Sequence, residues 1–175
     1  MDPKKLFKVV ITAIVVKDGK YLVLQRAARE KKFPSRWTVP GGKLDTEDYV
    51  HLPKDTPDYW YNVLERTLRR EVEEEAGIEI KNIRYVTSLA DLPARLAKAP
   101  AKRAGRQAHD EYPSLVISCL ADYASGEVVL DESMTEFRWV NLEEAKAVDL
   151  IDGIYEELEM ADNMLNRGSV SEWKK

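Results

Sequence analysis

The chain has 175 residues, of which 44% are hydrophobic and 33% charged, and its formal net charge is −4. These values predict one soluble domain over residues 1–175 and give no general attraction to nucleic acid. No apolar run approaches the roughly 20 residues of a membrane helix, and no leader sequence is recognisable, so we expect a cytoplasmic protein. A single cysteine, Cys119, excludes an internal disulfide, and its apolar surroundings predict a buried thiol rather than a nucleophile.

The first elements predicted along the chain are two strands joined by a tight turn. Residues 8–16 form a nearly continuous β-branched run, which is typical of a strand buried on both faces. The pair Asp18-Gly19 predicts a hairpin turn leading into a strand over 21–25. The loop 26–36 that follows is basic, with Arg26, Arg29, Lys31, Lys32 and Arg36 against the single acid Glu30. A solvated loop and a rim that attracts an anionic substrate both explain it.

The stretch 44–58 is acidic and contains Pro53 and Pro57, so an irregular excursion is expected there. A lid over a site, a contact in a homodimer and a plain surface excursion all remain open. After it, we expect a long helix that begins at Pro57 or Asp58 and ends at Ala76, just before Gly77.

The second half of the chain predicts further strands and two helices. The expected strands cover 78–88, 114–123 and 136–140, and the last helix covers 150–165. Asn141 followed by Glu144 indicates a capping box at the start of a shorter helix. The loop 91–113 carries five cations, Arg95, Lys98, Lys102, Arg103 and Arg106. It either grips phosphates or is a disordered or weakly helical excursion, and it lacks the interleaved aromatics of a single-strand binding surface.

The end of the long helix carries four glutamates within five residues. The apolar stripe of this helix is made of Tyr61, Leu64, Leu68 and Val72. At about 100° per residue, Glu71 and Glu75 project within that stripe, Glu74 lies at its edge and Glu73 lies opposite. A solvated acidic helix end would place its acids on the polar face instead. Buried like charges repel each other and need pairing or a metal, so this cluster predicts a divalent cation site.

Residues 70–78, R-E-V-E-E-E-A-G-I, resemble the second half of the Nudix box, R-E-U-x-E-E-x-G-U, in which U is aliphatic. Residues 37–43, W-T-V-P-G-G-K, resemble the strand and turn that open the same box. One departure separates the two halves. Arg70 follows Gly42 by 28 positions, which implies an insertion of about 14 residues. The first acid of the box falls on Asp48 when counted forward from Gly42 and on Asn62 when counted back from Arg70, so it stays unassigned.

The resemblance implies an α/β fold, the Nudix-like α/β/α sandwich with a mixed sheet between helices, over a core of about residues 8–165. It also implies hydrolase activity with Mg²⁺, or alternatively Mn²⁺, as cofactor. The implied metal ligands are Glu71, Glu74, Glu75, the Gly41 carbonyl and Glu132. Arg70 pairs with Glu74 in this interpretation and orients it. The residues expected at the substrate are Gly42, Lys43, Arg26 and Arg36, although plain exposure also explains Lys43 and a solvated turn also explains Glu132.

Three functions are compatible with these features. The first is a Mg²⁺-dependent pyrophosphohydrolase that cleaves the diphosphate bond of a nucleoside diphosphate linked to another moiety. The alternative is a catalytically silent Nudix-fold module that binds a nucleotide or senses it, which the interrupted box keeps open. The third is an enzyme that removes a diphosphate from RNA, which the net acidity disfavours. The expected partner is therefore a small nucleotide-type molecule, and neither nucleic acid nor a membrane.

Overall fold

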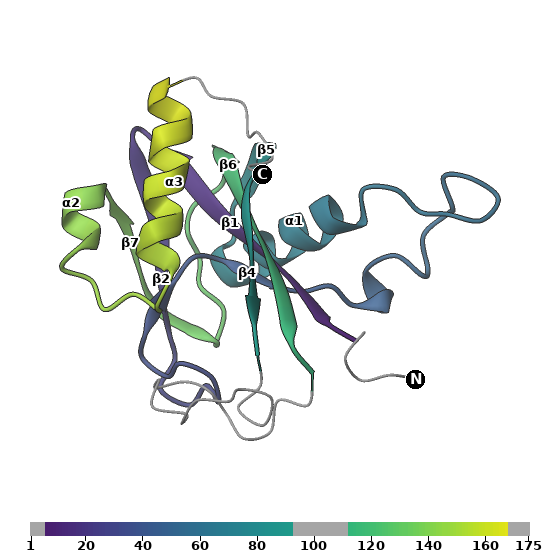
Figure 1. Cartoon of the computed structure of the whole chain (residues 1–175), viewed down its shortest axis with the longest axis horizontal. Coiled ribbons are helices and arrows are strands. Elements are labelled where there is room, and N and C mark those ends of the chain that lie inside the picture. Colours follow the sequence, from purple (N-terminus) through teal and green to yellow (C-terminus); the bar gives the residue numbers. More distant parts are fainter. Residues whose placement is uncertain (1–5, 93–111, 168–175) are drawn as a thin grey trace.

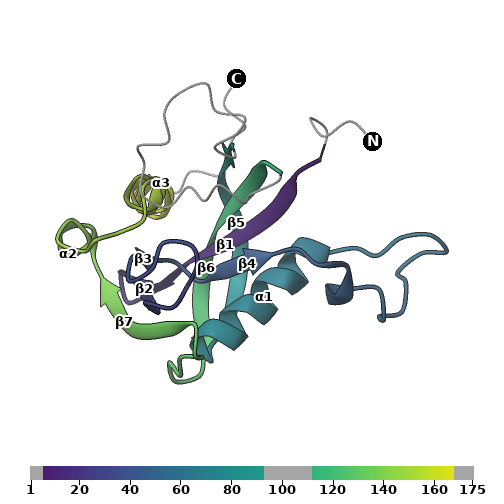
Figure 2. The ribbon, with the colours of Figure 1, turned by 90° about the horizontal axis from the view of Figure 1, so that it is seen from below.

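The computed structural model describes residues 6–92 and 112–167. A mixed sheet lies between helices on both of its faces, as Figures 1 and 2 show, and this confirms the predicted α/β sandwich. The strands are β1 (Lys8–Lys17), β2 (Lys20–Arg26), β3 (Trp37–Thr38), β4 (Gly41–Lys43), β5 (Glu79–Asp91), β6 (Ser114–Ser125) and β7 (Met134–Val140). The helices are a 3-10 turn at Thr46–Asp48, α1 (Val63–Ala76), α2 (Leu142–Ala145) and α3 (Ile154–Arg167).

The strand order is β3-β2-β1-β6-β5, with β4 beside β1 and β7 beside β2. β1 and β6 run parallel, with Ala13 opposite Cys119, and the other pairs among the described strands are antiparallel. β2 pairs with β1 only next to the hairpin, at Val16 and Lys17. Because β2 then diverges toward β7, β4 occupies the place beside the first half of β1, with Gly41 opposite Thr12. This topology fixes the Gly-Gly turn next to the central strand.

The core has two layers, one on each face of the sheet. Ile11 and Val15 of β1 pack toward α1, whereas Ile14 packs toward α3, so β1 is buried on both faces as its sequence predicts. Figure 2 shows α1 on one side of the strands and α3 on the other. Cys119 is buried on the α1 side, and this burial raises the pKa of its thiol to about 11, which agrees with a structural thiol.

The hairpin turn and the predicted helix cap are both confirmed. Asp18 and Gly19 have φ values of 49° and 73°, the left-handed conformation that a tight hairpin with the strand twist requires. At the start of α2, the Glu144 N–H donates to Asn141 Oδ1 at 2.8 Å and the Asn141 N–H donates to Glu144 Oε2 at 2.9 Å. Each side chain therefore satisfies a backbone group of the other residue.

Two predicted helix starts are wrong. α1 begins at Val63 rather than at Pro57 or Asp58, and α3 begins at Ile154 rather than near Leu150. Before α1, the backbone N–H groups of Asp55 and Thr56 donate to the Tyr59 carbonyl, so local turns replace the first helical turn. Before α3, Leu150 forms a bridge with Trp37 of β3. The apolar residue that continued the helical pattern therefore belongs to the edge of the sheet.

The insertion forms a loop that projects beyond α1, away from the sheet (Figures 1 and 2). It packs mainly on itself. The rings of Tyr49 and Trp60 lie 5.3 Å apart, and the Trp60 indole N–H donates to the Leu52 carbonyl at 2.9 Å. Asp55 accepts a hydrogen bond from the Tyr61 N–H at 2.9 Å. The loop thus has a small core of its own.

Most of the predicted basic loop 91–113, including its five cations, lies outside the described residues. Its ends are described, since Asp91 closes β5 and Pro113 precedes β6. Among the described helices, none has the length and apolar character needed to cross a membrane.

Candidate active site

The four glutamates at the end of α1 are exposed to different degrees, in the order that the apolar stripe predicts. Glu71 and Glu75 are half-buried, whereas Glu73 and Glu74 are exposed. The stripe itself is well buried, with Leu68 and Val72 fully buried among the core residues on the α1 side. The carboxylates of Glu71 and Glu75 therefore extend the buried face of α1 toward β4.

The end of this surface meets the Gly-Gly turn of β4. The Gly41 N–H donates to Glu75 Oε2 at 2.9 Å. A Cβ on Gly42 would lie 2.1 Å from the carboxyl carbon of Glu71, so the backbone there leaves no space for a side chain. Burial raises the pKa of Glu75 to about 8; the Gly41 N–H opposes this shift and the Glu71 charge adds to it. Burial likewise raises the pKa of Glu71.

Arg70 binds three carboxylates at once. Its Nη1 donates to Glu74 at 2.7 Å, its Nη2 to Glu71 at 2.8 Å and its Nε to Asp48 at 2.6 Å. The predicted pairing of Arg70 with Glu74 is therefore present, and it is one contact of a larger set. Because the guanidinium neutralises several acids together, it permits this density of negative charge on one helix face.

Asp48 is the site residue that sequence reasoning left unassigned. Its side chain is only 6% exposed, and it accepts hydrogen bonds from Arg70 Nε and, at 2.8 Å, from Thr67 Oγ1. Burial alone would raise the pKa of Asp48, but hydrogen bonds from Arg70, the Asp45 N–H and Thr67 lower it. Counting forward from Gly42 finds this residue, so the insertion lies after Asp48. The signal was therefore in the spacing, but nothing in the sequence ruled out the count that ends at Asn62.

The loop between β6 and β7 contributes a second acid that sequence reasoning missed. Glu132, the residue predicted there, pairs with Arg29 at 2.8 Å, and its side chain is 86% exposed. Its neighbour Asp131 is close enough to Glu75 to raise the pKa of that carboxyl. Asp131 itself accepts hydrogen bonds from the N–H and the hydroxyl of Ser133, at 2.9 and 2.7 Å. The sequence predicts an acid from this loop, and the position of Asp131 near Glu75 favours it over the adjacent Glu132.

The predicted substrate cations fall in different places. Arg26 is near enough to Glu75 for its charge to lower the pKa of that carboxyl, and it is held by Glu30 at 2.8 Å. Lys43 is exposed at the end of β4, in the same strand as Gly42. The guanidinium of Arg36 contacts the connection between α2 and α3 instead. It pairs with Asp149 at 3.1 Å and Asp152 at 3.4 Å, and it also donates to the Leu150 carbonyl.

The donors of this region suit a hard divalent cation, because all of them are carboxylate or carbonyl oxygens. Within residues 6–92 and 112–167, however, no three acidic, histidine or cysteine side chains already surround one point. The contacts explain this: Arg70 holds Glu71 and Glu74, whereas Glu75 is turned to the Gly41 N–H. A cation would have to draw Glu71 and Glu74 from Arg70 toward Glu75. The chemistry of the residues fits a metal, although these rotamers do not yet form its ligand shell.

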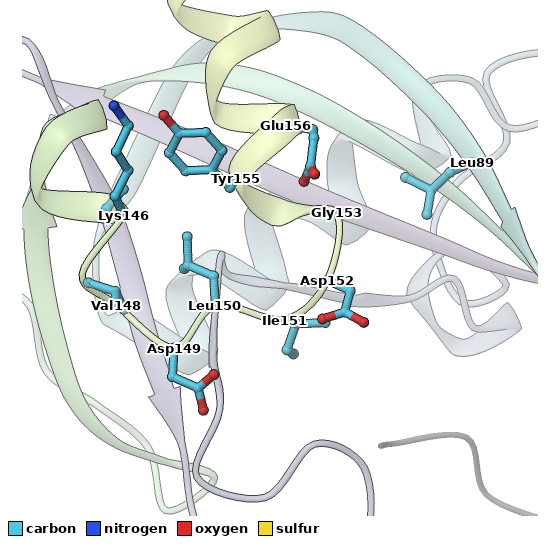
Figure 3. A pocket seen from close by; sticks show the side chains of 11 residues that line it. Leu89, Lys146, Val148, Asp149, Leu150, Ile151, Asp152, Gly153, Tyr155 and Glu156 are labelled. Atoms are coloured by element: carbon cyan, nitrogen blue, oxygen red, sulfur yellow. The ribbon is translucent and has the colours of Figure 1, made fainter. Parts of the chain in front are cut away.

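A cavity of about 770 Å³ lies on the other face of the sheet (Figure 3). None of the glutamates at the end of α1 lines it. That cavity is bordered by the connection from α2 to α3, the first turn of α3 and Leu89 of β5. The molecule thus carries an acidic cluster on its α1 side and a separate hollow on its α3 side.

A family model described as the NUDIX domain matches residues 6–158. The nucleoside triphosphatase NudI of Klebsiella pneumoniae is 24% identical over 144 residues, which cover 82% of this chain and 88% of that protein. The NAD-capped RNA hydrolase NudC of an Enterobacter species is 38% identical over 77 residues, which cover 43% of this chain but only 23% of that protein.

Solved structures share the fold. A MutT NUDIX hydrolase from Burkholderia pseudomallei superimposes with a TM-score of 0.64 at 22% identity, covering 89% of this chain and 98% of its own. The NUDIX domain of Shewanella oneidensis NrtR, complexed with ADP ribose, superimposes with a TM-score of 0.64 at 19% identity, covering 94% of each chain. At these identities the likeness concerns the fold alone.

Proposed function

Because the chain belongs to the Nudix family, whose hydrolases act on phosphoanhydride bonds, we propose that it is a Mg²⁺-dependent pyrophosphohydrolase. The bond cleaved is the diphosphate bond of a nucleoside diphosphate linked to another moiety. One observation carries the proposal: Glu71 and Glu75 occupy the buried stripe of α1 and meet the backbone of Gly41 and Gly42. Two half-buried carboxylates against bare backbone are costly for folding alone, but they are suited to a cation and a phosphate.

The residues that would hold the cation are Glu71, Glu74 and Glu75, with the Gly41 carbonyl beside them. From the β6–β7 loop we now favour Asp131 over Glu132, because the charge of Asp131 acts on Glu75 whereas Glu132 is committed to Arg29. A divalent cation at this point would neutralise phosphate charge and make a water molecule more acidic. Mn²⁺ has the same preference for oxygen ligands and would serve as a substitute.

The residues of the chain contribute binding and orientation. The glycines of β4 allow the diphosphate to approach the backbone closely, since a side chain at Gly42 would collide with Glu71. Lys43 and Arg26 supply positive charge near the phosphates. Arg70 holds Glu71 and Glu74 in place until the substrate complex forms, and Asp48 fixes Arg70 in turn. In the metal-free protein burial raises the pKa of Glu75 to about 8, so this carboxyl would release its proton when a cation binds.

The nucleotide character of the substrate rests on likeness. NudI, which is named a nucleoside triphosphatase, aligns over most of its length with this chain, and the NrtR domain was solved with ADP ribose. The likeness to NudC covers less than a quarter of that protein, so an RNA-directed activity has less support. A silent nucleotide-binding module is the second candidate, because the carboxylates do not yet surround one point in the described residues.

The experiment is a hydrolysis screen over nucleoside triphosphates and nucleoside diphosphates linked to sugars, alcohols and nucleosides. Each substrate is incubated with Mg²⁺, with Mn²⁺ and with a chelator, and the nucleotide products are separated. Wild type is compared with Glu75→Gln and with Glu73→Gln, a matched control on the exposed face of α1. Metal-dependent turnover that only Glu75→Gln loses supports the enzyme. Nucleotide binding without turnover, unchanged by the chelator, would establish the silent module instead.

A further inference from the structure

The strand β7 forms one edge of the sheet. Among the described strands, β2 alone pairs with β7, and Figures 1 and 2 show β7 at an outer side of the sheet, next to α2. Residues 135–138 are exposed in succession, although neighbouring residues of a strand point to opposite faces. Both faces of β7 are therefore open along this stretch, and the backbone groups on its outer side point away from the sheet.

The strand β5 forms another edge, but its shape does not favour pairing with a further strand. Its register with β6 shifts at three places, and Asn82 takes a φ of 51°. Bulges of this kind bend a strand and are a common protection of sheet edges. In contrast, β7 keeps one register with β2 from Val140 to Glu136, and its sequence M-T-E-F-R-W-V contains neither glycine nor proline. Of these two edges, β7 is the more regular template.

Charged and aromatic side chains alternate along β7. Glu136 and Arg138 pair with each other at 2.8 Å, and their side chains remain 47% and 50% exposed. Phe137 points to the other face, opposite Leu24 of β2, and is 39% exposed although it is a large apolar residue. A hollow of about 430 Å³, lined by residues 137–140 and by residues of α2 and the turn after it, leaves space beside this edge.

Two copies of β7 can pair antiparallel about a two-fold axis perpendicular to the sheet. Residues directly opposite each other then point to the same face, so the axis has to pass between two copies of the same residue. An axis at Phe137 places Glu136 opposite the partner's Arg138, and it does so twice. An axis at Glu136 or at Arg138 would instead place like charges opposite each other. Charge complementarity therefore selects the register centred on Phe137.

We propose that the outer edge of β7 is the interface of a homodimer, in which two copies of the chain pair antiparallel about Phe137 and their sheets become continuous. An edge with charges of one sign would repel its own copy, whereas Glu136 and Arg138 match the charges of theirs. In this register Met134 lies opposite the partner's Val140. The interface uses none of the residues proposed to bind the cation or the diphosphate, so it does not depend on the proposed function.

The first test measures self-association of the full chain by sedimentation velocity. The concentrations run from about 1 µM to about 1 mM, because a single pair of strands buries a small area and binds weakly. We expect one monomer–dimer equilibrium, which added salt weakens because ion pairs contribute to it. A chain that stays monomeric over this range, or that forms open-ended assemblies, would overturn the proposal.

Charge reversal tests the register. Glu136→Arg and Arg138→Glu should each weaken self-association by about tenfold or more, because each places like charges opposite each other. An equimolar mixture of the two variants should regain dimers, since one chain then presents two cations and the other two anions. Glu65→Arg, the same charge change at an exposed residue of α1, is the matched control and should associate as wild type. A mixture that stays monomeric would overturn the register.

The folding of the variants needs a separate check. The Arg138 guanidinium also lies 4.5 Å from the centre of the Trp37 ring, so Arg138→Glu removes a favourable contact within the chain. If this variant does not fold, Glu136→Arg decides alone, and wild-type association of Glu136→Arg would overturn the proposal.

Phe137→Cys gives a covalent readout of the same axis. The two introduced thiols would face each other with Cα atoms about 4.5–5.5 Å apart, which is within reach of a disulfide. Val129→Cys, at a position that is 67% exposed and outside β7, is the control, and the natural Cys119 is buried. Oxidised glutathione should convert Phe137→Cys to covalent dimers and leave Val129→Cys monomeric. Equal crosslinking of the two variants would overturn the proposal.

Discussion

On each face of the sheet, an arginine binds several partners at once. On the α1 side, Arg70 binds Asp48, Glu71 and Glu74, and on the α3 side Arg36 binds Asp149, Asp152 and the Leu150 carbonyl. On each side, a largely buried glutamate remains outside this arrangement. These are Glu75, which within residues 6–92 and 112–167 accepts a hydrogen bond from the Gly41 N–H, and Glu157, which lies beside the Ser118 hydroxyl.

The comparison distinguishes acids that hold the fold from acids that we propose to bind a ligand. The partners of Arg36 include backbone, and they fasten a connection between helices. The partners of Arg70 are all carboxylates, and one of them, Glu71, lies against Gly42 of β4. We expect the carboxylates that Arg70 binds to serve the proposed cation site, and the contacts of Arg36 to hold the connection between α2 and α3 in place. The following changes test this distinction, beginning with the largest expected effect.

Glu71→Gln should lower Mg²⁺-dependent turnover by about a thousandfold, because it removes a proposed metal ligand. Its stability without metal should be equal or higher, since the half-buried charge and its repulsion by Glu74 disappear. Turnover and chelator-treated thermal unfolding measure the two effects. A large loss of stability in the metal-free variant would show that Glu71 serves the fold rather than a metal.

The metal-free protein should lose stability as the pH rises from about 4.5 to about 8. Over this window the unfolded chain releases the Glu75 proton while the folded chain keeps it, because burial raises the folded pKa from 4.5 to about 8. The loss should be on the order of 5 kcal/mol, and Mg²⁺ should reduce it. Urea unfolding across the window measures this dependence. Glu75→Gln should flatten the curve, and a slope that persists in this variant would assign the effect to other groups.

Truncating each of the two arginines to alanine sharpens the comparison. Arg70→Ala should lower turnover by about tenfold or more, because Glu71 and Glu74 lose the group that orients them. Arg36→Ala should chiefly lower the free energy of unfolding, by about 1–2 kcal/mol, through the loss of its contacts with the α2–α3 connection. Steady-state kinetics and urea unfolding of both variants provide the test. A raised KM in Arg36→Ala would instead support the substrate role that the sequence predicted for Arg36.

Replacing residues 50–61 by a short glycine linker should have the smallest effect. The loop packs on itself, and Asp48, Thr67 and Arg70 would keep their contacts. We expect turnover within about twofold of wild type and stability within about 1 kcal/mol, since loop-closure entropy varies slowly with length. Asp48→Asn in the full-length chain is the control that should cost more. Loss of turnover in the shortened chain would make the insertion part of the site.

Periodicity and local chemistry predicted much of the fold. The β-branched run of β1, the Asp18-Gly19 turn and the capping box at Asn141 are each encoded by adjacent residues. The inward direction of Glu71 and Glu75 also follows from spacing within one helix. The starts of α1 and α3 were missed because local turns and a bridge to Trp37 override the apolar pattern. The bridge joins residues far apart in the sequence, whereas the turns before α1 are local but leave no periodic apolar pattern.

The candidate site likewise contains residues that local motifs predict and contacts that no local pattern predicts. The glutamates and glycines lie within recognisable motifs, so their positions were accessible from the sequence. The contact of Asp48 with Arg70 spans 22 positions and the contact of Arg36 with Asp149 spans 113, and no local pattern predicts either partner. The choice between Asp131 and Glu132 depends on which side chain turns toward Glu75. These distinctions need the three-dimensional packing.

The contacts of Asp48 with Arg70 and Thr67 connect the two halves of the box across the insertion. Because these contacts hold Asp48 against α1, the chain between Tyr49 and Val63 can differ in length without moving either half. A segment that leaves the body at Tyr49 and returns at Val63 is thus a natural attachment point beside the proposed diphosphate site. A fluorescent reporter or an affinity tag grafted there would report on the site without altering a residue proposed to act in it.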